Sequence, residues 1–197
     1  MGTIVVTNHL SLDGVMQAPA GTDEDPRGGF TKGGWAANDN DEVMGRVMGE
    51  GMASSTGLLL GRRTYEHFFS FWPHQRDNPF SEVLDNTQKY VASTTLTEPL
   101  PWVSSTLLAG DAADGVEVLR KEPDLHLTIL GSGALIQSLA ARNLIDRYVL
   151  LIHPVVLGSG RRLFTDGGAA ADLRLVDSVA TTKGVMIATY EPTTAPA

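Results

Sequence analysis

The chain has 197 residues and carries 23 acidic and 15 basic side chains, which gives a formal net charge of −8. This length suits one well-packed domain, and we expect a single domain over residues 1–191. The acidic balance argues against non-specific nucleic-acid binding, which needs a basic surface. Disulfides and thiol chemistry are excluded because the sequence has no cysteine.

The first residues, "MGTIVVTNHL", lack the charged segment and the long apolar segment of a signal peptide. No apolar run in the sequence approaches the length of a membrane span. We therefore expect a cytoplasmic protein that does not bind membranes.

Taken in chain order, the hydrophobic pattern alternates between the period of strands and the period of helices. A long loop rich in Gly, Pro and Asp (16–35) follows the first strand, and a loop of this length in a compact domain is usually functional or disordered. The predicted strands are 3–10, 56–60, 89–93, 102–106, 125–130 and 146–158, the predicted helices are 38–52, 64–72, 112–121 and 134–143, and a hairpin is predicted over 172–191. Residues 192–197 are expected to form a disordered tail.

This order of elements predicts the fold class. Strands that alternate with helices favour a mostly parallel sheet covered on both faces, and strands alone at the end favour an antiparallel edge. The predicted fold is therefore α/β.

The segment "LLLGRRT" places a glycine and two arginines where a strand gives way to a helix. Ligands of open α/β sheets bind at the carboxyl ends of the strands, and a helix N-terminus attracts anions. Arg also donates paired hydrogen bonds to phosphate. Gly61, Arg62, Arg63 and Thr64 are therefore candidates for phosphate contacts, although solvated arginines and a threonine cap would give the same pattern.

Two further strand ends carry similar chemistry. In "TILGSGALIQSL", Gly131 and Gly133 permit close approach of a pyrophosphate, or simply a tight turn. This is not a Rossmann fingerprint, because Ile136 stands where the third glycine belongs. Ser93 and Thr94 follow another strand, where their hydroxyls are suited to an adenosine phosphate. Together the three turns favour a dinucleotide lying across the sheet, and the extra arginine favours NADPH.

The segments "SLDG", "LLLGRRTYE", "KYVAS", "GSGALIQSL" and "HPVVLGSGRRLF" occur in this order along the chain. In this order they resemble the reductase-domain family named after the C-terminal half of the riboflavin-biosynthesis deaminase/reductase (RibD), within the dihydrofolate reductase superfamily. The resemblance runs from Thr3 to about Tyr190. It implies a three-layer α/β/α fold around a mostly parallel sheet of about eight strands, NADPH as the hydride donor, and a homodimer.

The resemblance also implies cofactor contacts from residues at four turns. Two departures from the family pattern concern the chemistry: Ser132 replaces the second glycine of a Gly-Gly pair, and Gly45 stands where dihydrofolate reductases carry a helix carboxylate. The implied contacts are Val15, Met16 and Gln17 beside the nicotinamide, Gly61, Arg62, Arg63 and Thr64 at the adenosine-half phosphates, Ser93 and Thr94 at the 2′-phosphate, and Gly131, Ser132, Gly133, Ala134 and Leu135 along the pyrophosphate and nicotinamide.

Three residues are candidates for acid–base chemistry. Asp39 shares the inward face of the first helix, where it could protonate a substrate nitrogen or only complement the helix dipole. Asp13 is a turn-former or a substrate-side acid. His153 ends a strand, and its imidazole could bind substrate or be satisfied by the backbone.

Other residues are candidates for substrate binding. Phe30 and Trp35 could stack on a flat heterocycle or pack in the core, and Arg161 could bind a substrate phosphate or lie in a turn. The histidines show no metal-ligand spacing, so we expect no metal site.

The leading hypothesis is an NADPH-dependent reductase of a small heterocycle, either a pterin-like compound or the riboflavin precursor 5-amino-6-(5-phosphoribosylamino)uracil. The zinc deaminase motif needs cysteines, and the chain has none. Two alternatives stay open: a non-catalytic nucleotide- or ligand-binding protein, and a reductase that uses a flavin or a deazaflavin.

Overall fold

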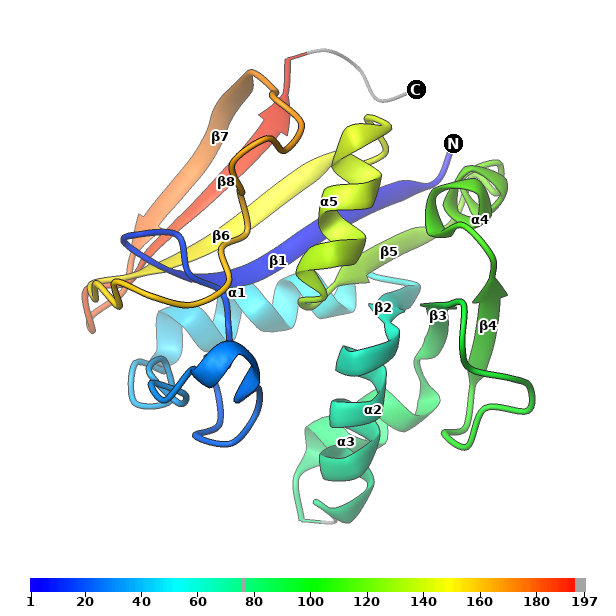
Figure 1. The fold of residues 1–197 in the computed structure, drawn as a ribbon, viewed down its shortest axis with the longest axis horizontal. Coiled ribbons are helices and arrows are strands. Elements are labelled where there is room, and N and C mark those ends of the chain that lie inside the picture. The colour runs from blue at the N-terminus through cyan, green and yellow to red at the C-terminus, as the bar shows by residue number, and fades with distance from the viewer. Residues whose placement is uncertain (76, 194–197) are drawn as a thin grey trace.

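The structure is a computed structural model that describes residues 1–75 and 77–193. Strands and helices alternate through most of the chain (Figure 1). The strands are β1 (Thr3–Ser11), β2 (Gly57–Gly61), β3 (Gln88–Ser93), β4 (Ser105–Ala109), β5 (His126–Ile129), β6 (Arg147–His153), β7 (Leu173–Ala180) and β8 (Met186–Pro192). The helices are α1 (Glu42–Ala53), α2 (Arg62–Phe71), α3 (Pro79–Asn86), α4 (Ala112–Leu119) and α5 (Gly133–Ala141), with 3-10 turns η1 (Arg27–Gly29) and η2 (Trp72–His74).

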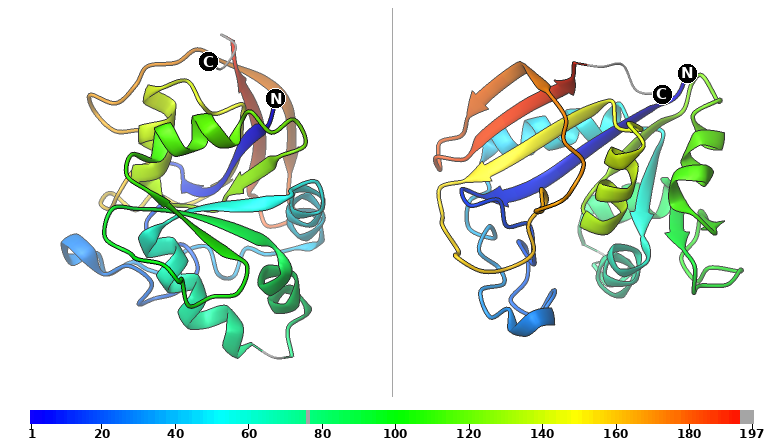
Figure 2. Two further views of the ribbon diagram at one scale, coloured as in Figure 1. Left: turned by 90° about the vertical axis from the view of Figure 1, so that its right-hand side faces the viewer. Right: turned by 45° about the horizontal axis from the view of Figure 1, so that its top comes forward.

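The eight strands form one sheet in the order β4-β3-β2-β5-β1-β6-β8-β7. All neighbours from β4 to β6 pair in parallel, and β8 pairs antiparallel with both β6 and β7. Figure 2 shows the C-terminal hairpin continuing the sheet beyond β6. The predicted fold class is confirmed: a mostly parallel sheet of eight strands ends in an antiparallel hairpin.

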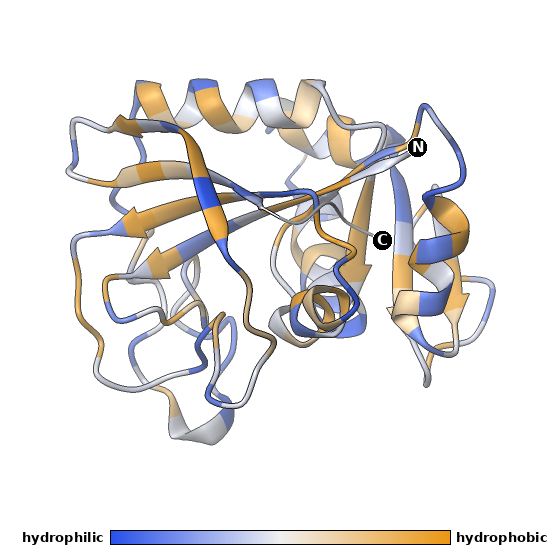
Figure 3. Cartoon of the chain, turned by 90° about the horizontal axis from the view of Figure 1, so that it is seen from above, coloured by the Kyte–Doolittle hydropathy of each residue, from blue (hydrophilic) through white to orange (hydrophobic). Residues whose placement is uncertain are grey.

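Helices cover both faces of the sheet, and apolar clusters lie on each face. On one face, Ile4 and Val6 of β1 pack with Ile136 of α5 and Val116 of α4. On the other face, α1, α2 and α3 contribute to two further apolar clusters. Figure 3 shows the sheet edge-on, with α1 and α5 on opposite sides of it. In the described part of the chain, no helix has the length and apolar character that crossing a membrane requires.

The C-terminal hairpin also holds the start of α1. Asp41 is the N-cap of α1, and its Oδ1 accepts the backbone N–H of Met44 at 2.9 Å. Its Oδ2 accepts the backbone N–H of Thr182 at 2.6 Å and the hydroxyl of Thr182 at 2.7 Å. Thr182 lies in the turn between β7 and β8. One carboxylate therefore caps the helix and ties it to the hairpin.

Several predicted boundaries are wrong. Helix α3, which begins at an Asn78 cap, lies in a stretch for which no element was predicted. The first helix starts at Glu42 and not at residue 38, because Asp41 is its cap. β6 stops at His153, so residues 154–158 are loop. β8 reaches Pro192, which the prediction placed in the tail, and residues 194–197 of that tail lie outside the described residues.

Candidate functional site

The turns after β2 and β5 contact each other at the carboxyl end of the sheet. The backbone N–H of Gly61 donates to Oγ of Ser132 at 2.9 Å. The hydroxyls of Thr64 and Ser132 lie 2.6 Å apart. A Cβ on Gly61 would stand only 2.8 Å from Oγ of Ser132. Glycine is therefore needed here for the close packing of the two turns, and this packing brings the N-termini of α2 and α5 together.

These two helices differ from the others in how they begin. Side chains of Asp41, Asn78 and Asp111 cap α1, α3 and α4, and each of those helices has an acid in its first turn. Neither α2 nor α5 has a side-chain cap or a first-turn acid. The first N–H groups of a helix have no intrahelical partner and carry partial positive charge. The joined starts of α2 and α5 are thus suited to bind an anion.

Positive charge lies at the same place. Arg62 is half-buried and approaches Glu66 at 3.9 Å, a weak pair on the helix surface. Arg63 is exposed, and it makes no ion pair within the described residues. Thr94 is also exposed, whereas Ser93 is buried and its Oγ accepts the backbone N–H groups of Thr95 and Leu96. Arg63 and Thr94 are therefore available to a ligand. The Ser93 oxygen instead accepts hydrogen bonds from the loop that follows it.

Residues 15–17 lie beside the start of α5. Val15 is fully buried, and Met16 packs so closely on Gly133 that a Cβ there would come within 2.7 Å of the Met16 sulfur. Gln17 is buried as well, and its amide is fully used. Its Nε2 donates to the carbonyls of Asp25 and Arg27, and its Oε1 accepts the N–H of Arg161. Gln17 thus holds the long loop in place with both of its amide protons and with its amide oxygen.

At α5 itself, the predicted contact residues divide by exposure. Leu135 is buried in the core, which leaves its backbone as the only part suited to ligand contact. Ala134 is exposed in the first turn of the helix. Gly131 and Ser132 both have positive φ, of 93° and 72°, so the turn bends sharply before α5 begins.

Asp13 has a structural role in place of the acid role that we considered. Its Oδ1 accepts the hydroxyl of Ser11 at 2.7 Å and the N–H of Leu157 at 3.0 Å. Its Oδ2 accepts the N–H of Gly158 at 2.8 Å. These hydrogen bonds, with that from Ser11 the largest contribution, lower the pKa of Asp13 well below its usual range. A carboxylate held ionised in this way is a poor proton donor.

Asp39 and His153 meet, and a third residue joins them. Nδ1 of His153 lies 2.7 Å from Oδ2 of Asp39, and Nε2 of His153 lies 2.8 Å from Nδ1 of His9. His153 is fully buried, and the ring of Trp35 meets it edge-on with centroids 5.3 Å apart. His9 was not among the predicted site residues. The sequence offered one weak indication of this role: His9 is a titratable residue on the same face of the predicted strand as Thr7.

The other predicted substrate contacts are placed differently. Phe30 is buried against Val15 and Leu157, so it packs the loop and presents no open ring face. Trp35 is half-buried and donates its indole N–H to the carbonyl of Gln17 at 2.8 Å. The side chain of Arg161 is exposed on the loop after β6. Of these three predicted contacts, only Trp35 reaches the Asp39–His153 pair.

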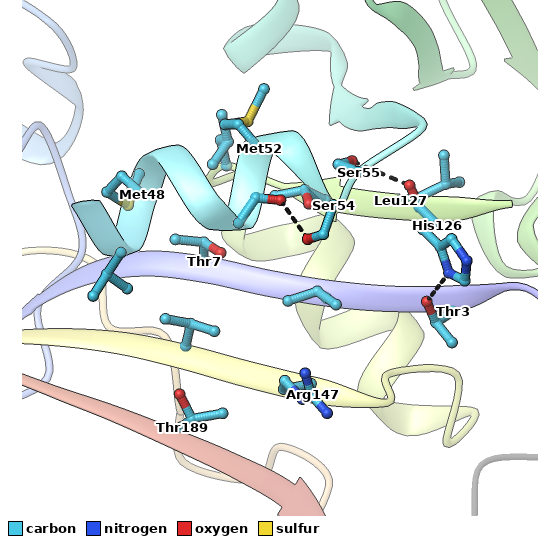
Figure 4. A pocket seen from close by; sticks show the side chains of 16 residues that line it. Thr3, Thr7, Met48, Met52, Ser54, Ser55, His126, Leu127, Arg147 and Thr189 are labelled. Atoms are coloured by element: carbon cyan, nitrogen blue, oxygen red, sulfur yellow. Dashed lines mark hydrogen bonds between the residues drawn. The ribbon is translucent and has the colours of Figure 1, made fainter. Parts of the chain in front are cut away.

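A cavity of about 330 Å³ lies between α1 and the sheet. Figure 4 shows α1 along one side of it and β1, β5 and β6 along the other. Its apolar surface comes from both sides, and its polar groups gather at the amino ends of the strands. The residues that line it are Thr3, Val5, Thr7, Val47, Met48, Gly51, Met52, Ser54, Ser55, His126, Leu127, Thr128, Leu130, Arg147, Val149 and Thr189.

The cavity lining comes close in sequence to both parts of the candidate site. Thr7 lines it, and His9 is the next residue on the same face of β1, about 7 Å further along the strand. Leu130 also lines it and directly precedes the Gly131–Ser132 turn. The ladder between β1 and β5 ends at the Val6–Ile129 pair, although β1 continues to Ser11. The cavity lining therefore stops at Thr7, two residues before His9, and at Leu130, one residue before Gly131.

Comparisons with known proteins agree with this fold. The family model described as the RibD C-terminal domain matches residues 2–187. The uncharacterised protein YyaP of Bacillus subtilis is 28% identical over 141 residues, which are 68% of this chain and 72% of YyaP.

Two solved structures show the same architecture. A Shewanella sp. PV-4 protein assigned provisionally to riboflavin biosynthesis superposes with a TM-score of 0.73 at 24% identity, covering 98% of this chain and 99% of that one. A dihydrofolate reductase from Enterococcus faecalis, complexed with NADP(H) and a ligand named RAB-propyl, gives a TM-score of 0.60 at 14% identity, covering 98% of this chain and 97% of that one. The match of the family model over nearly the whole sequence shows that the chain belongs to the RibD C-terminal domain family.

Proposed function

We propose that this protein is an NADPH-dependent reductase of a small heterocycle, either a pyrimidine of the riboflavin-precursor type or a pterin. The observation that carries the proposal is the contact between Gly61 and Ser132, which joins two uncapped helix starts beside a cavity. Membership in the RibD C-terminal domain family and the likeness to a dihydrofolate reductase fold support the same function.

The donor set fits a dinucleotide with several phosphates. In the proposed complex, N–H groups at the starts of α2 and α5 would hold the pyrophosphate. Arg63, with Arg62 and the hydroxyl of Thr94, would hold the 2′-phosphate, because guanidinium groups match phosphate geometry. The bound cofactor would supply a hydride.

The size and lining of the cavity support a small heterocyclic substrate. Its volume of about 330 Å³ suits a small ring system. Met48, Met52 and Leu130 offer an apolar surface for the faces of a ring, and Thr7 offers a hydroxyl to a ring edge. The proposal places the reacting end of the substrate near Leu130 and His9, where the cofactor turn comes closest.

The first test is cofactor binding, measured by isothermal titration with NADPH and NADH. We expect Arg62→Ala combined with Arg63→Ala to weaken NADPH binding far more than NADH binding, because each charge-assisted phosphate contact is worth about 1.5–3 kcal/mol. Arg46→Ala is the matched control, since Arg46 is an exposed α1 arginine that pairs only with Glu50 among the described residues. Equal losses for both cofactors would contradict the assignment of the 2′-phosphate site.

The second test is turnover. NADPH oxidation should be followed across a panel of pterins and phosphoribosylamino-pyrimidines. Tight NADPH binding without oxidation on any of them would favour the non-catalytic alternative. Stronger binding of a flavin or deazaflavin than of NADPH would favour the other alternative. The homodimer expected from the family resemblance stays a prediction, which light scattering can check.

A further inference from the structure

Asp39, His153 and His9 form a continuous hydrogen-bonded chain at the carboxyl end of β1 and β6. The two links are 2.7 Å and 2.8 Å long. The middle member, His153, is fully buried. His9 is the outer member and is half-buried. Within the described residues, Nε2 of His9 makes no hydrogen bond, and it is not among the buried polar atoms that lack a partner. It is therefore the open end of the chain.

The positions of the protons along this chain are limited to two patterns. An ionised carboxylate only accepts hydrogen bonds, so Nδ1 of His153 carries a proton that it donates to Asp39. If His153 is neutral, its Nε2 accepts the Nδ1–H of His9, and Nε2 of His9 is unprotonated. If His153 is charged, its Nε2–H donates to Nδ1 of His9, and Nε2 of His9 carries a proton. The two patterns differ by one proton, which enters or leaves at Nε2 of His9.

This arrangement separates the positive charge from the transferable proton. Burial, followed by the proximity of His153, lowers the pKa of His9 to about 4, so His9 does not hold a charge at neutral pH. In the charged pattern the imidazolium is His153, next to the Asp39 carboxylate. The sheet-facing α1 side chains Met44 and Met48 are uncharged, so Asp39 and His153 are the titratable groups that act on His9.

We propose that His9 donates the proton that accompanies hydride transfer, with His153 and Asp39 as positioning residues that reload it. This proposal rests on the proposed reductase function and names the proton source for the same site. Nε2 of His9 gives its proton to the substrate atom next to the carbon that accepts the hydride. Nδ1 of His9 then takes the proton from Nε2 of His153, and both rings end neutral while Asp39 stays ionised. One proton from water restores the charged pattern.

The placement of His9 agrees with this role. It follows Thr7 on one face of β1, and Thr7 lines the cavity proposed for the substrate. A purely structural role would be to fix the loop that carries Asp39 to the sheet. That role needs the two hydrogen bonds but does not need an open nitrogen on His9 or a change of tautomer.

The first experiment uses the whole protein without cofactor or substrate. Long-range ¹H–¹⁵N NMR on histidine-labelled protein reports which ring nitrogens carry protons as the pH is changed. We expect His9 to move its proton from Nδ1 to Nε2 as the pH falls. Asp39→Asn should shift that change to lower pH, because it removes a negative charge that raises the pKa of His9. A His9 that keeps one tautomer throughout would overturn the proposal.

The second experiment measures NADPH turnover with the substrate found in the panel. His9→Asn keeps an amide where Nδ1 stood and removes Nε2, so the chain stays anchored but cannot deliver a proton. We expect kcat to fall about 10²–10⁴-fold with unchanged NADPH affinity, while the exposed His74→Asn control keeps wild-type kcat. Wild-type kcat in His9→Asn would refute the donor role. Failure of the wild-type protein to bind NADPH would instead refute the proposed function, and the donor role with it. The NMR experiment would still report whether His9 changes its tautomer.

Discussion

The close contact between Gly61 and Ser132 leads to a prediction about stability. Gly61 has φ −78° and ψ 157°, an ordinary extended conformation that alanine also adopts. In the absence of a clash, Gly61→Ala would therefore stabilise the fold by about 0.4–1 kcal/mol, because alanine lowers the conformational entropy of the unfolded chain. The new Cβ, however, would stand 2.8 Å from Oγ and 2.9 Å from Cβ of Ser132. Overpacking of this kind costs about 1–3 kcal/mol, so we expect a net destabilisation of about 1–2 kcal/mol.

Ser132→Gly should remove that destabilisation. Ser132 has φ 72° and ψ 68°, a left-handed conformation that favours glycine. Relief of this strain is worth about 1–2 kcal/mol. The two lost hydrogen bonds, from Gly61 and with Thr64, cost about 1 kcal/mol each, so Ser132→Gly alone should change little. In the double variant the obstructing atoms are gone, and we expect Gly61→Ala to become neutral or stabilising. The predicted coupling is about 1–3 kcal/mol.

The assay is equilibrium urea unfolding of the four proteins, followed by tryptophan fluorescence and circular dichroism. Gly45→Ala is the matched control, because nothing lies within 4 Å of a Cβ there. It should stabilise α1 by about 0.5–1 kcal/mol. Additive effects of Gly61→Ala and Ser132→Gly would refute the close packing of the two turns. NADPH titration of Gly61→Ala would show whether separating the helix starts also weakens cofactor binding, as we expect.

Three further predictions concern single side chains. Nζ of Lys89 donates to three carbonyl oxygens at the end of α3, so Lys89→Met should lower stability by about 1–3 kcal/mol in urea unfolding. Burial lowers the pKa of Lys89 from 10.5 to about 8. The free energy of unfolding of the wild type relative to this variant should therefore rise as the pH is raised from about 8 to 10.5, and a difference that does not change with pH would contradict the buried charge. Hydrogen bonds from Met44 and Thr182 lower the pKa of Asp41 from its usual 3.8. The Asp41 carboxylate therefore contributes to stability above pH 3.8, and this contribution is lost as the pH falls through the lower pKa of the folded state. Asp41→Asn should flatten that part of the acid-unfolding curve, and an unchanged curve would contradict the prediction. Thr7→Phe should fill the cavity, abolishing turnover while the Kd for NADPH stays within about twofold; normal turnover would place the substrate elsewhere.

Much of the fold could be predicted from the sequence because its signals are local. The apolar alternation of β1 and the glycine-bounded strand before α2 predict their elements without knowledge of the rest of the chain. The rim of the sheet could be predicted for a similar reason, since carboxyl ends of parallel strands lie together. α3 was missed because it is short, and its signal is only an Asn78 cap followed by proline.

The candidate proton chain could not be predicted in full, because its contacts span the chain. His9 and His153 are 144 residues apart, and Asp39 and His153 are 114 apart. No periodicity identifies such pairs. The structural role of Asp13 is hidden for the same reason, since two of its partners belong to the loop after β6. Sequence alone could therefore list candidate acids. It could not show that Asp13 is fully hydrogen-bonded within its turn, whereas Asp39 binds a histidine.

The bond between Asp41 and Thr182 has a consequence for biosynthesis. The helix that covers the cavity is complete by residue 53, yet the turn that holds its N-cap, Asp41, contains Thr182 and is synthesised much later. Contacts of this sequence separation form late, because the intervening chain must first be ordered. On the ribosome, a nascent protein lacking its last two strands would have all of its aspartates and histidines of interest but an unanchored helix above them. Ligand binding should thus begin only after the turn that contains Thr182 has been synthesised, and truncation before residue 182 should abolish it.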